Sequence, residues 1–175
     1  VRFRLRSGVV WSDGQPLSTE DVIFSFRVIK NARVNAPPLQ SYYSDLQEVR
    51  VLSDNEIEVI WAKPYFKMLS IAGGKTILPA HCYRKKYGVA DESSPEFADH
   101  FNKDRDLPEV TTGNYLFKAW ESGKSIRLVR NPRSWQQGLG NFDEIHYAVI
   151  TDRTAQMQQL KNLALDSMSL EVQEY

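Results

Sequence analysis

The sequence predicts an α/β fold of mixed α+β character, in which strands and helices follow one another without a regular strand–helix–strand alternation. Three observations support this prediction. The chain opens on an alternating strand pattern, a capped amphipathic helix follows over 19–31, and two hairpins are expected at 49–61 and 115–130. With 175 residues and 42% hydrophobic content, the chain can bury a core without disulfides or metals as staples.

The first strand is expected over residues 1–6, where apolar residues take one face and arginines the other. A period of two residues is typical of a strand with one face buried and the other in solvent. We interpret Arg2, Arg4 and Arg6 as the solvent face of this strand, and the alternative is a phosphate-binding patch.

A turn and a capped helix follow this strand. Asp13-Gly14 predicts a tight turn, because glycine accepts a positive φ and aspartate bonds to nearby backbone. Ser18 and Asp21 have the spacing of a capping box, which predicts a helix from residue 19 to about 31. The apolar stripe of this helix comprises Val22, Phe26 and Ile29.

The middle of the chain carries both strand and helix signals. Segments 49–52 and 56–61 are apolar and flank the turn residues 53–55, which predicts a hairpin. Three short helices are expected after it, and the second is introduced by Pro79 and closed by Gly88. These helices are placed at 67–72, 79–87 and 95–102.

The last part of the chain predicts a second sheet and a final helix. Segments 115–120 and 125–130 form the second hairpin, and 144–150 alternates as a further strand. A helix is expected over 154–166 because apolar residues recur there with helical spacing. Its apolar face comprises Met157, Leu160, Leu163 and Ala164.

Charge and composition exclude several classes of protein. Basic and acidic residues number 22 each, so the formal net charge is 0. A neutral chain lacks the positive field of a typical nucleic-acid-binding protein, and no nucleic-acid partner is expected. Cys82 is the single cysteine, which excludes an internal disulfide. No run approaches the roughly 18 apolar residues of a membrane span.

The start of the chain indicates a piece of a longer protein. It lacks an initiator methionine and begins inside the alternating pattern of residues 1–6. The lack of a signal peptide in these residues therefore says nothing about where the whole protein is located.

Metal-ligating residues are few and scattered. His81, His100 and His146 lie far apart in the sequence and form no His-Glu-x-x-His pattern. His81 and Cys82 are neighbours, but adjacent positions on a helix point about 100° apart, so we expect no shared metal there. Asp99 and His100 are interpreted as part of a helix surface. No metal site and no cofactor are predicted.

No catalytic constellation is recognisable in the sequence either. There is no Gly-x-Ser-x-Gly pattern of a nucleophile elbow. Residues 73–76 read Gly-Gly-Lys-Thr, like the end of a phosphate-binding loop, but Leu69 stands where that loop needs its first glycine. We therefore predict that the chain is not an enzyme and carries no catalytic residues.

Aromatic residues are the other candidates for a site. Trp11 is interpreted as a packing anchor, and the alternative is a reactive or ligand-stacking group. Tyr42 and Tyr43 follow Pro37-Pro38 in a segment expected to be a loop. Loop tyrosines can line a pocket, because each offers rigid apolar area and one hydroxyl. The alternative is that they cap a small hydrophobic cluster.

Several segments, taken together and in this order, resemble the family 5 extracellular solute-binding proteins, the peptide, dipeptide and nickel receptors of ABC importers. The likeness covers nearly the whole chain. It is carried by FRLRSGVVWSDGQPLSTEDVIFSF, VRVLSDNEIEVIWAKPYF, ILPAHCY, TTGNYLFKAWESGKSIRLVRNPRSW and FDEIHYAVITD.

The resemblance implies part of a type II periplasmic-binding-protein fold, in which two lobes close on a ligand by hinge motion. Residues 1–78 would be the small extra domain of this family, and 79–166 part of the first ligand-binding lobe. Residues 167–175 would be a tail near the hinge crossing, and the second lobe is absent.

Two segments depart from the family pattern. The family's Gly-Thr-Gly-Pro-Tyr becomes Thr111-Thr112-Gly113-Asn114-Tyr115, which alters a loop near the cleft between the lobes. The family's Gly-Glu turn before the hinge becomes Leu163-Ala164. From this comparison and the tyrosines above, the candidate ligand-binding residues are Tyr42, Tyr43, Gly113 and Asn114.

The function implied by the resemblance is that of a non-enzymatic receptor. It would capture peptides or a similar small solute between its lobes and deliver them to a membrane permease of an ABC importer. The whole protein would be a monomer. It would lie in the periplasm, or be anchored to the membrane on its extracytoplasmic side. The alternative is a ligand module of a regulator or sensor that has lost transport.

Overall fold

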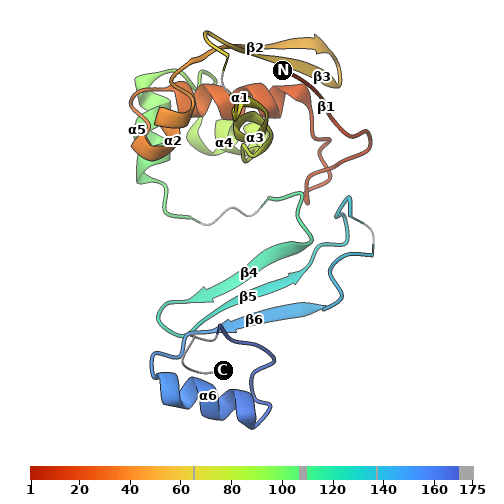
Figure 1. The fold of residues 1–175 in the computed structure, drawn as a ribbon, viewed down its shortest axis with the longest axis vertical. Helices are drawn as coiled ribbons and strands as arrows, with labels where there is room; N and C mark the ends of the chain where they lie inside the picture. Colours follow the sequence, from red (N-terminus) through yellow and green to blue (C-terminus); the bar gives the residue numbers. More distant parts are fainter. Residues whose placement is uncertain (65, 107–109, 137, 170–175) are drawn as a thin grey trace.

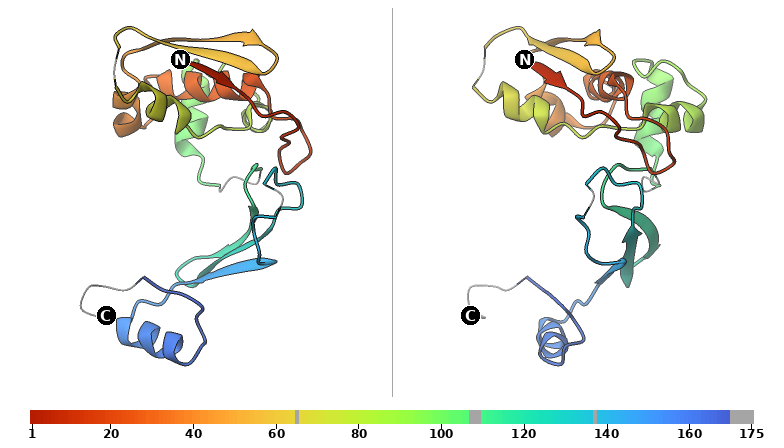
Figure 2. Two further views of the ribbon diagram at one scale, coloured as in Figure 1. Left: turned by 45° about the vertical axis from the view of Figure 1, so that its right-hand side comes forward. Right: turned by 90° about the vertical axis from the view of Figure 1, so that its right-hand side faces the viewer.

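The computed structural model describes residues 1–64, 66–106, 110–136 and 138–169. The chain forms two parts along its long axis: an α/β part made of the residues up to 106, and a three-stranded sheet followed by one helix (Figure 1). The two further views show the same separation (Figure 2). Of the tail expected at 167–175, the end at 170–175 lies outside the described residues.

The first part contains a three-stranded antiparallel sheet and five helices. Its elements are β1 (Arg2–Arg4), α1 (Thr19–Lys30), α2 (Pro37–Tyr42), β2 (Leu46–Ser53), β3 (Glu56–Trp61), α3 (Met68–Gly73), α4 (Ala80–Tyr87) and α5 (Pro95–Lys103). The strands are ordered β1-β3-β2, with Phe3 opposite Ile57 and Val49 opposite Val59.

Most sequence predictions for this part are confirmed. The hairpin forms, and the three short helices lie within a few residues of their expected places. Arg2, Arg4 and Arg6 are exposed, as predicted for the solvent face of the first strand. The loop expected around Tyr42 is wrong, because α2 (Pro37–Tyr42) forms there with prolines in its first turn, where their missing N–H costs no hydrogen bond.

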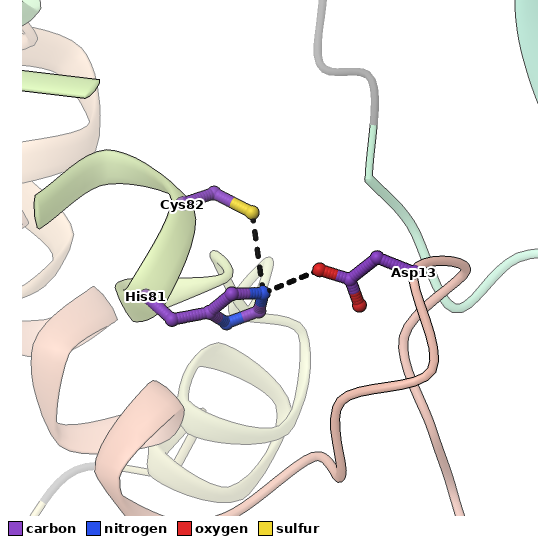
Figure 3. Close-up of side chains that lie close together, drawn as sticks. All are labelled: Asp13, His81 and Cys82. Carbon is purple, nitrogen blue, oxygen red and sulfur yellow. Dashed lines mark hydrogen bonds and ion pairs between the residues drawn. The ribbon is translucent and has the colours of Figure 1, made fainter. Parts of the chain in front are cut away.

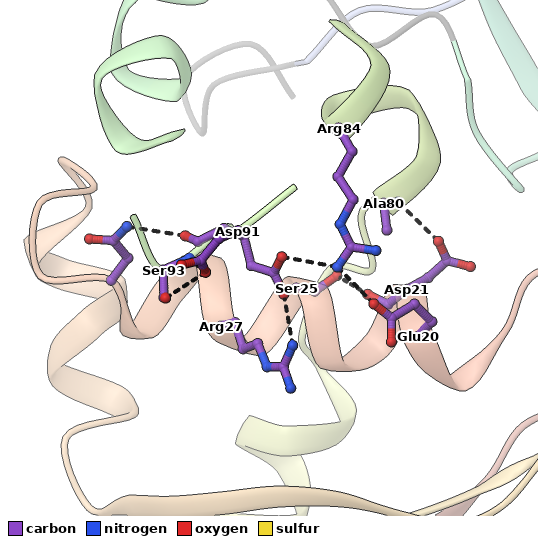
Figure 4. A network of polar contacts seen from close by, with 10 residues as sticks. Glu20, Asp21, Ser25, Arg27, Ala80, Arg84, Asp91 and Ser93 are labelled. Atoms are coloured by element: carbon purple, nitrogen blue, oxygen red, sulfur yellow. Dashed lines mark hydrogen bonds and ion pairs between the residues drawn. The ribbon is translucent and has the colours of Figure 1, made fainter. Parts of the chain in front are cut away.

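Helix α1 begins at the predicted capping box of Ser18 and Asp21. Asp21 is buried, and its carboxylate accepts hydrogen bonds from three N–H groups: that of Ser18 at 3.0 Å, the indole of Trp11 at 3.2 Å and that of Ala80 at 2.9 Å. The Ser18 hydroxyl lies 3.4 Å from the same carboxylate and also donates to it. The bond from Ala80 is visible in Figure 4. Asp21 thus joins the start of α1 to the start of α4, which is 59 residues away in the chain.

The interpretation of Trp11 as a packing anchor is confirmed. Its side chain is only 2% exposed, and its single polar group donates to Asp21. A buried indole usually finds a hydrogen-bond partner for its N–H, and Asp21 is that partner here.

Helix α1 is buried on two faces, each facing a separate core. One face packs against the sheet through the predicted stripe, and the other packs against α4 and α5 through Phe24 and Val28. Phe24 is fully buried and meets Phe97 edge to face, with ring centroids 5.6 Å apart. The sequence pattern revealed only the first of these faces.

The second core places α4 and α5 in the same part as the first hairpin. Ala80 of α4 and Phe97 of α5 pack around Phe24 of α1. Buried Glu92 accepts hydrogen bonds from Arg27 of α1 and Arg84 of α4, at 3.1 and 2.9 Å. In this chain, the boundary predicted between 78 and 79 therefore runs through a packed unit, and its meaning for the lobes of a complete receptor stays a prediction.

The second part is a meander of three antiparallel strands, ordered β4-β5-β6, followed by one helix. Its elements are β4 (Tyr115–Glu121), β5 (Ser125–Arg130), β6 (Glu144–Ala148) and α6 (Arg153–Lys161). The predicted hairpin and third strand are confirmed. Large apolar side chains on and beside this sheet are exposed, namely Trp120, Phe142, Tyr147 and Val149.

Helix α6 ends earlier than the predicted 154–166. Its last residue is Lys161, and Leu163 takes a left-handed backbone conformation with φ 58°. The N–H of Leu163 donates to the carbonyl of Leu160, and the N–H of Ala164 donates to that of Gln159. These two bonds form a Schellman motif, so Leu163 occupies the position where helices usually end in glycine.

Replacing Leu163 with glycine is expected to stabilise the end of α6 by about 1 kcal/mol, because a side chain at a left-handed position costs roughly that much. Leu163 is 89% exposed, so little packing is lost. Amide hydrogen exchange at Ala164 measures the gain as greater protection in Leu163→Gly. The matched control, Leu163→Ala, removes most of the same side chain but keeps the strain. Equal protection in the two variants would contradict this prediction.

Candidate functional site

The two candidate tyrosines have different surroundings. Tyr42 ends α2 and is 59% exposed. Tyr43 is 8% exposed and packs in the first core, where its ring lies edge to face on Phe26. Its hydroxyl donates to the carbonyl of Ile71 at 3.0 Å. Tyr43 therefore does cap a hydrophobic cluster, which was the alternative reading, and a ligand contact for either tyrosine stays a prediction.

The candidate loop at Gly113 and Asn114 lies where the two parts of the chain meet. Its neighbour Thr111 is joined to the first part by two hydrogen bonds: the Ser12 N–H donates to the Thr111 carbonyl at 2.9 Å, and the Thr111 N–H donates to the Ser12 hydroxyl at 3.2 Å. The loop that departs from the family pattern is therefore the loop that contacts the Trp11–Gly14 turn.

Asn131 holds this loop from the other side, a role that the sequence analysis did not predict. It is buried, its side-chain amide donates to the Gly113 carbonyl at 2.7 Å, and its backbone N–H donates to the Asn114 carbonyl at 2.8 Å. The side chain of Asn114 accepts a bond from the Ser134 hydroxyl at 2.5 Å. A local sequence pattern could not have predicted this role, because the residues that bond to each other are 17 to 20 positions apart in the chain.

Two arginines also cross the junction between the parts. Arg133 donates to the Ser12 carbonyl at 2.8 Å, and the guanidinium of Arg6 lies over the Trp135 ring at 4.7 Å from its centroid. Arginine over an indole is a favourable cation–π arrangement. The junction is therefore largely polar, and Ser12 accepts or donates in each of the three hydrogen bonds described here.

The turn at Asp13 brings together three groups that the sequence did not connect. Nε2 of His81 lies 2.7 Å from Oδ2 of Asp13 and 3.2 Å from Sγ of Cys82 (Figure 3). The expectation that His81 and Cys82 point apart is wrong, because both residues lie in the first turn of α4 and the thiol bends toward the imidazole.

The pKa of Asp13 reports the surroundings of this cluster. Burial by itself would raise the pKa of the carboxyl. The hydrogen bond from His81, the backbone N–H of Gln15 and the charge of His81 together outweigh burial, so the pKa of Asp13 lies below its usual value. Asp13 is thus held as a carboxylate beside His81.

A small cavity lies in the first part between the sheet and α1. Its volume is about 140 Å³, below the roughly 300 Å³ at which pockets for drug-sized ligands begin. Its lining includes Phe3, Leu5, Val22, Phe26, Ile57 and Lys75. Burial lowers the pKa of Lys75. This cavity is too small to enclose a peptide.

The mixed strands and helices of the two parts match a fragment of the type II periplasmic-binding-protein fold. Solved structures agree with this class. The periplasmic oligopeptide-binding protein of an oligopeptide ABC transporter from Thermotoga maritima superimposes with a TM-score of 0.77 at 19% identity, covering 94% of this chain and 29% of that one. The predicted fold class is confirmed.

The family is shown by the match of residues 1–174 to the bacterial extracellular solute-binding proteins, family 5. The chain belongs to this family. It is 27% identical over 171 residues to the "Probable peptide-binding protein YejA" of Agrobacterium fabrum, and 24% identical over 183 residues to the periplasmic oligopeptide-binding protein OppA of Salmonella typhimurium. Each match includes 94% of this chain, but only 26% of the length of YejA and 31% of the length of OppA.

The predicted resemblance is therefore confirmed, and the chain spans about a quarter to a third of its relatives. Family 5 consists of extracellular solute-binding proteins. Within the described residues, no helix combines the length and the apolar character needed to cross a bilayer.

Proposed function

We propose that this chain is part of the substrate-binding component of an ABC importer, and that the whole protein captures peptides between two lobes and delivers them to a membrane permease. The observation that carries this proposal is the family match over residues 1–174. The names of the relatives YejA and OppA, both peptide-binding proteins, favour peptides over other solutes. In this role the protein is a receptor without catalysis, a periplasmic monomer, with a peptide and a permease as partners.

The proposed ligand contacts are Tyr42, Tyr43, Gly113 and Asn114. Within this set, the loop at Gly113 and Asn114 has the better structural support as a ligand contact, for two reasons. Its carbonyls are held by Asn131, so the backbone is preorganised. It also lies at the junction of the two parts, next to the Ser12 turn. A fixed backbone lowers the entropy that a ligand must overcome on binding.

The chain alone is expected to bind peptides weakly or not at all. A ligand held on one side only gains a fraction of the contact area, while association still costs several kcal/mol. Isothermal titration of the 175-residue chain with a mixed pool of short peptides should give no affinity in the micromolar range or tighter. Micromolar binding by the chain alone would contradict the expectation that a second lobe is needed.

The same titration on the full-length protein tests the function itself. It is expected to bind the pool at least at micromolar affinity, and mass spectrometry of the bound fraction identifies the peptides. Asn114→Ala in the full-length protein should weaken binding, whereas Leu69→Ala, which removes an exposed side chain from α3, serves as the matched control. The peptide assignment would be overturned if the full-length protein does not bind peptides but co-purifies with another solute from the expression host.

A further inference from the structure

Three donor groups from two distant segments converge at the surface of the first part. The Asp13 carboxylate comes from the turn before α1, and the imidazole of His81 and the thiol of Cys82 come from the first turn of α4, 68 residues later. One ligating atom from each lies within 4.8 Å of the other two. Figure 3 shows the imidazole edge facing both partners.

The arrangement differs from a catalytic relay. In a relay, the acid holds one ring nitrogen of the histidine and the nucleophile faces the other. Here the carboxylate of Asp13 and the sulfur of Cys82 both approach Nε2 of His81. A single nitrogen shares only one proton, so it cannot serve both groups at once. Three donors that point at one place are instead the arrangement of ligands around a cation.

We propose that Asp13, His81 and Cys82 form a three-ligand site for a divalent transition metal of the Zn²⁺ class. A thiolate with an imidazole selects such borderline-soft ions, whereas Mg²⁺ and Ca²⁺ prefer oxygen ligands alone. Three protein ligands leave the fourth tetrahedral position open. The half-exposed position of the cluster lets water or a solute group fill it.

The spacing fits a metal after a small expansion. Zinc bonds of 2.0 to 2.3 Å in a tetrahedron place neighbouring donor atoms about 3.4 to 3.6 Å apart. The nitrogen–sulfur distance is 3.2 Å and the nitrogen–oxygen distance is 2.7 Å, so the carboxylate must retreat by several tenths of an ångström. Asp13 can do so because it lies in an exposed turn, next to Gly14 at φ 92°.

A bound metal would join the Asp13 turn to α4. The same turn contacts the junction loop through Ser12 and Thr111. Metal binding would therefore hold the turn that faces the second part of the chain. This site does not depend on the proposed transport function, because its ligands all lie in the first part and none belongs to the proposed peptide contacts.

The test is a metal titration of the tag-free, chelator-treated 175-residue chain with its thiol kept reduced. We expect one Zn²⁺ per chain at micromolar affinity or tighter, measured against a chromophoric chelator. Co²⁺ should give a thiolate-to-cobalt charge-transfer band, and this band reports Cys82 alone because the chain has one cysteine. Protons should be released on binding, because the thiol must ionise.

Three variants assign the ligands. Cys82→Ser, His81→Gln and Asp13→Asn should each weaken Zn²⁺ binding by about tenfold or more, because losing even an outer-shell partner of a ligand costs that much. Cys82→Ser should also abolish the cobalt band. His100→Gln is the matched control, since His100 stacks on Tyr87 outside the cluster. Circular dichroism checks that every variant is folded.

The proposal is overturned by any of three results. These are the lack of stoichiometric Zn²⁺ binding, a Co²⁺ complex without the charge-transfer band, or unchanged affinity in Cys82→Ser and His81→Gln. The proposal would also be contradicted if His100→Gln weakened Zn²⁺ binding as much as the three ligand variants do.

Discussion

Asp21→Ala is expected to destabilise the chain by about 3–5 kcal/mol, because it removes a buried carboxylate that is the common acceptor for three N–H groups and the Ser18 hydroxyl. The N–H groups of Ser18, Trp11 and Ala80 all bond to this carboxylate. Asp21 is buried, so water cannot replace it without opening the packing between α1 and α4. The variant loses the helix cap and the link between two segments in one step.

Urea unfolding followed by Trp fluorescence and circular dichroism measures this loss. Glu20→Ala is the matched control, since Glu20 lies in the same helical turn and only makes a partly exposed ion pair with Arg84. It should cost less than about 1 kcal/mol. Asp21→Asn keeps one acceptor oxygen and should fall between the two. An Asp21→Ala variant as stable as Glu20→Ala would show that the shared carboxylate contributes little.

Phe24→Ala is expected to cost about 3–5 kcal/mol, the usual range for deleting a buried aromatic ring. Phe24 is fully buried in the second core, where its ring contacts Phe97 and Tyr83. The guanidinium of Arg84 also lies over the Phe24 ring at 5.3 Å. Removing the ring leaves a cavity on the face of α1 that packs against α4 and α5.

The same unfolding measurement applies, with Phe142→Ala as the control of identical chemistry. Phe142 is 67% exposed, so its truncation should change stability by no more than about 0.5 kcal/mol. Phe24→Leu should lose clearly less free energy of unfolding than Phe24→Ala, because the leucine side chain fills most of the space that the ring leaves. Equal losses in Phe24→Ala and Phe142→Ala would mean that the second core does not stabilise the chain.

The features predicted correctly from the sequence are local ones. The capping box of Ser18 and Asp21 lies within four residues, and the hairpin strands alternate within six to eight. Such patterns depend on neighbours along the chain, so the pattern itself carries the information. The long stretches shared with the family added the type II periplasmic-binding-protein fold, which no single element defines.

Two errors have different causes: an unusual residue at a helix end, and a second covered face of α1. Leu163 has helical spacing but a left-handed backbone, because the helix ends there in a Schellman motif. Phe24 lies off the predicted stripe, yet it is buried because α4 and α5 cover that side of α1. Hydrophobic periodicity cannot reveal a second covered face when the covering helices come from more than 50 residues away.

By itself, the sequence determined the strands, the main helices and the family, because each rests on short-range patterns or on long matched segments. Only the tertiary structure decided that Asn131 holds the candidate loop, that Asp21 joins two helices, and that Asp13 meets His81 and Cys82. The physical reason is distance along the chain. These contacts join residues 18 to 68 positions apart, and their geometry exists only after both cores have packed.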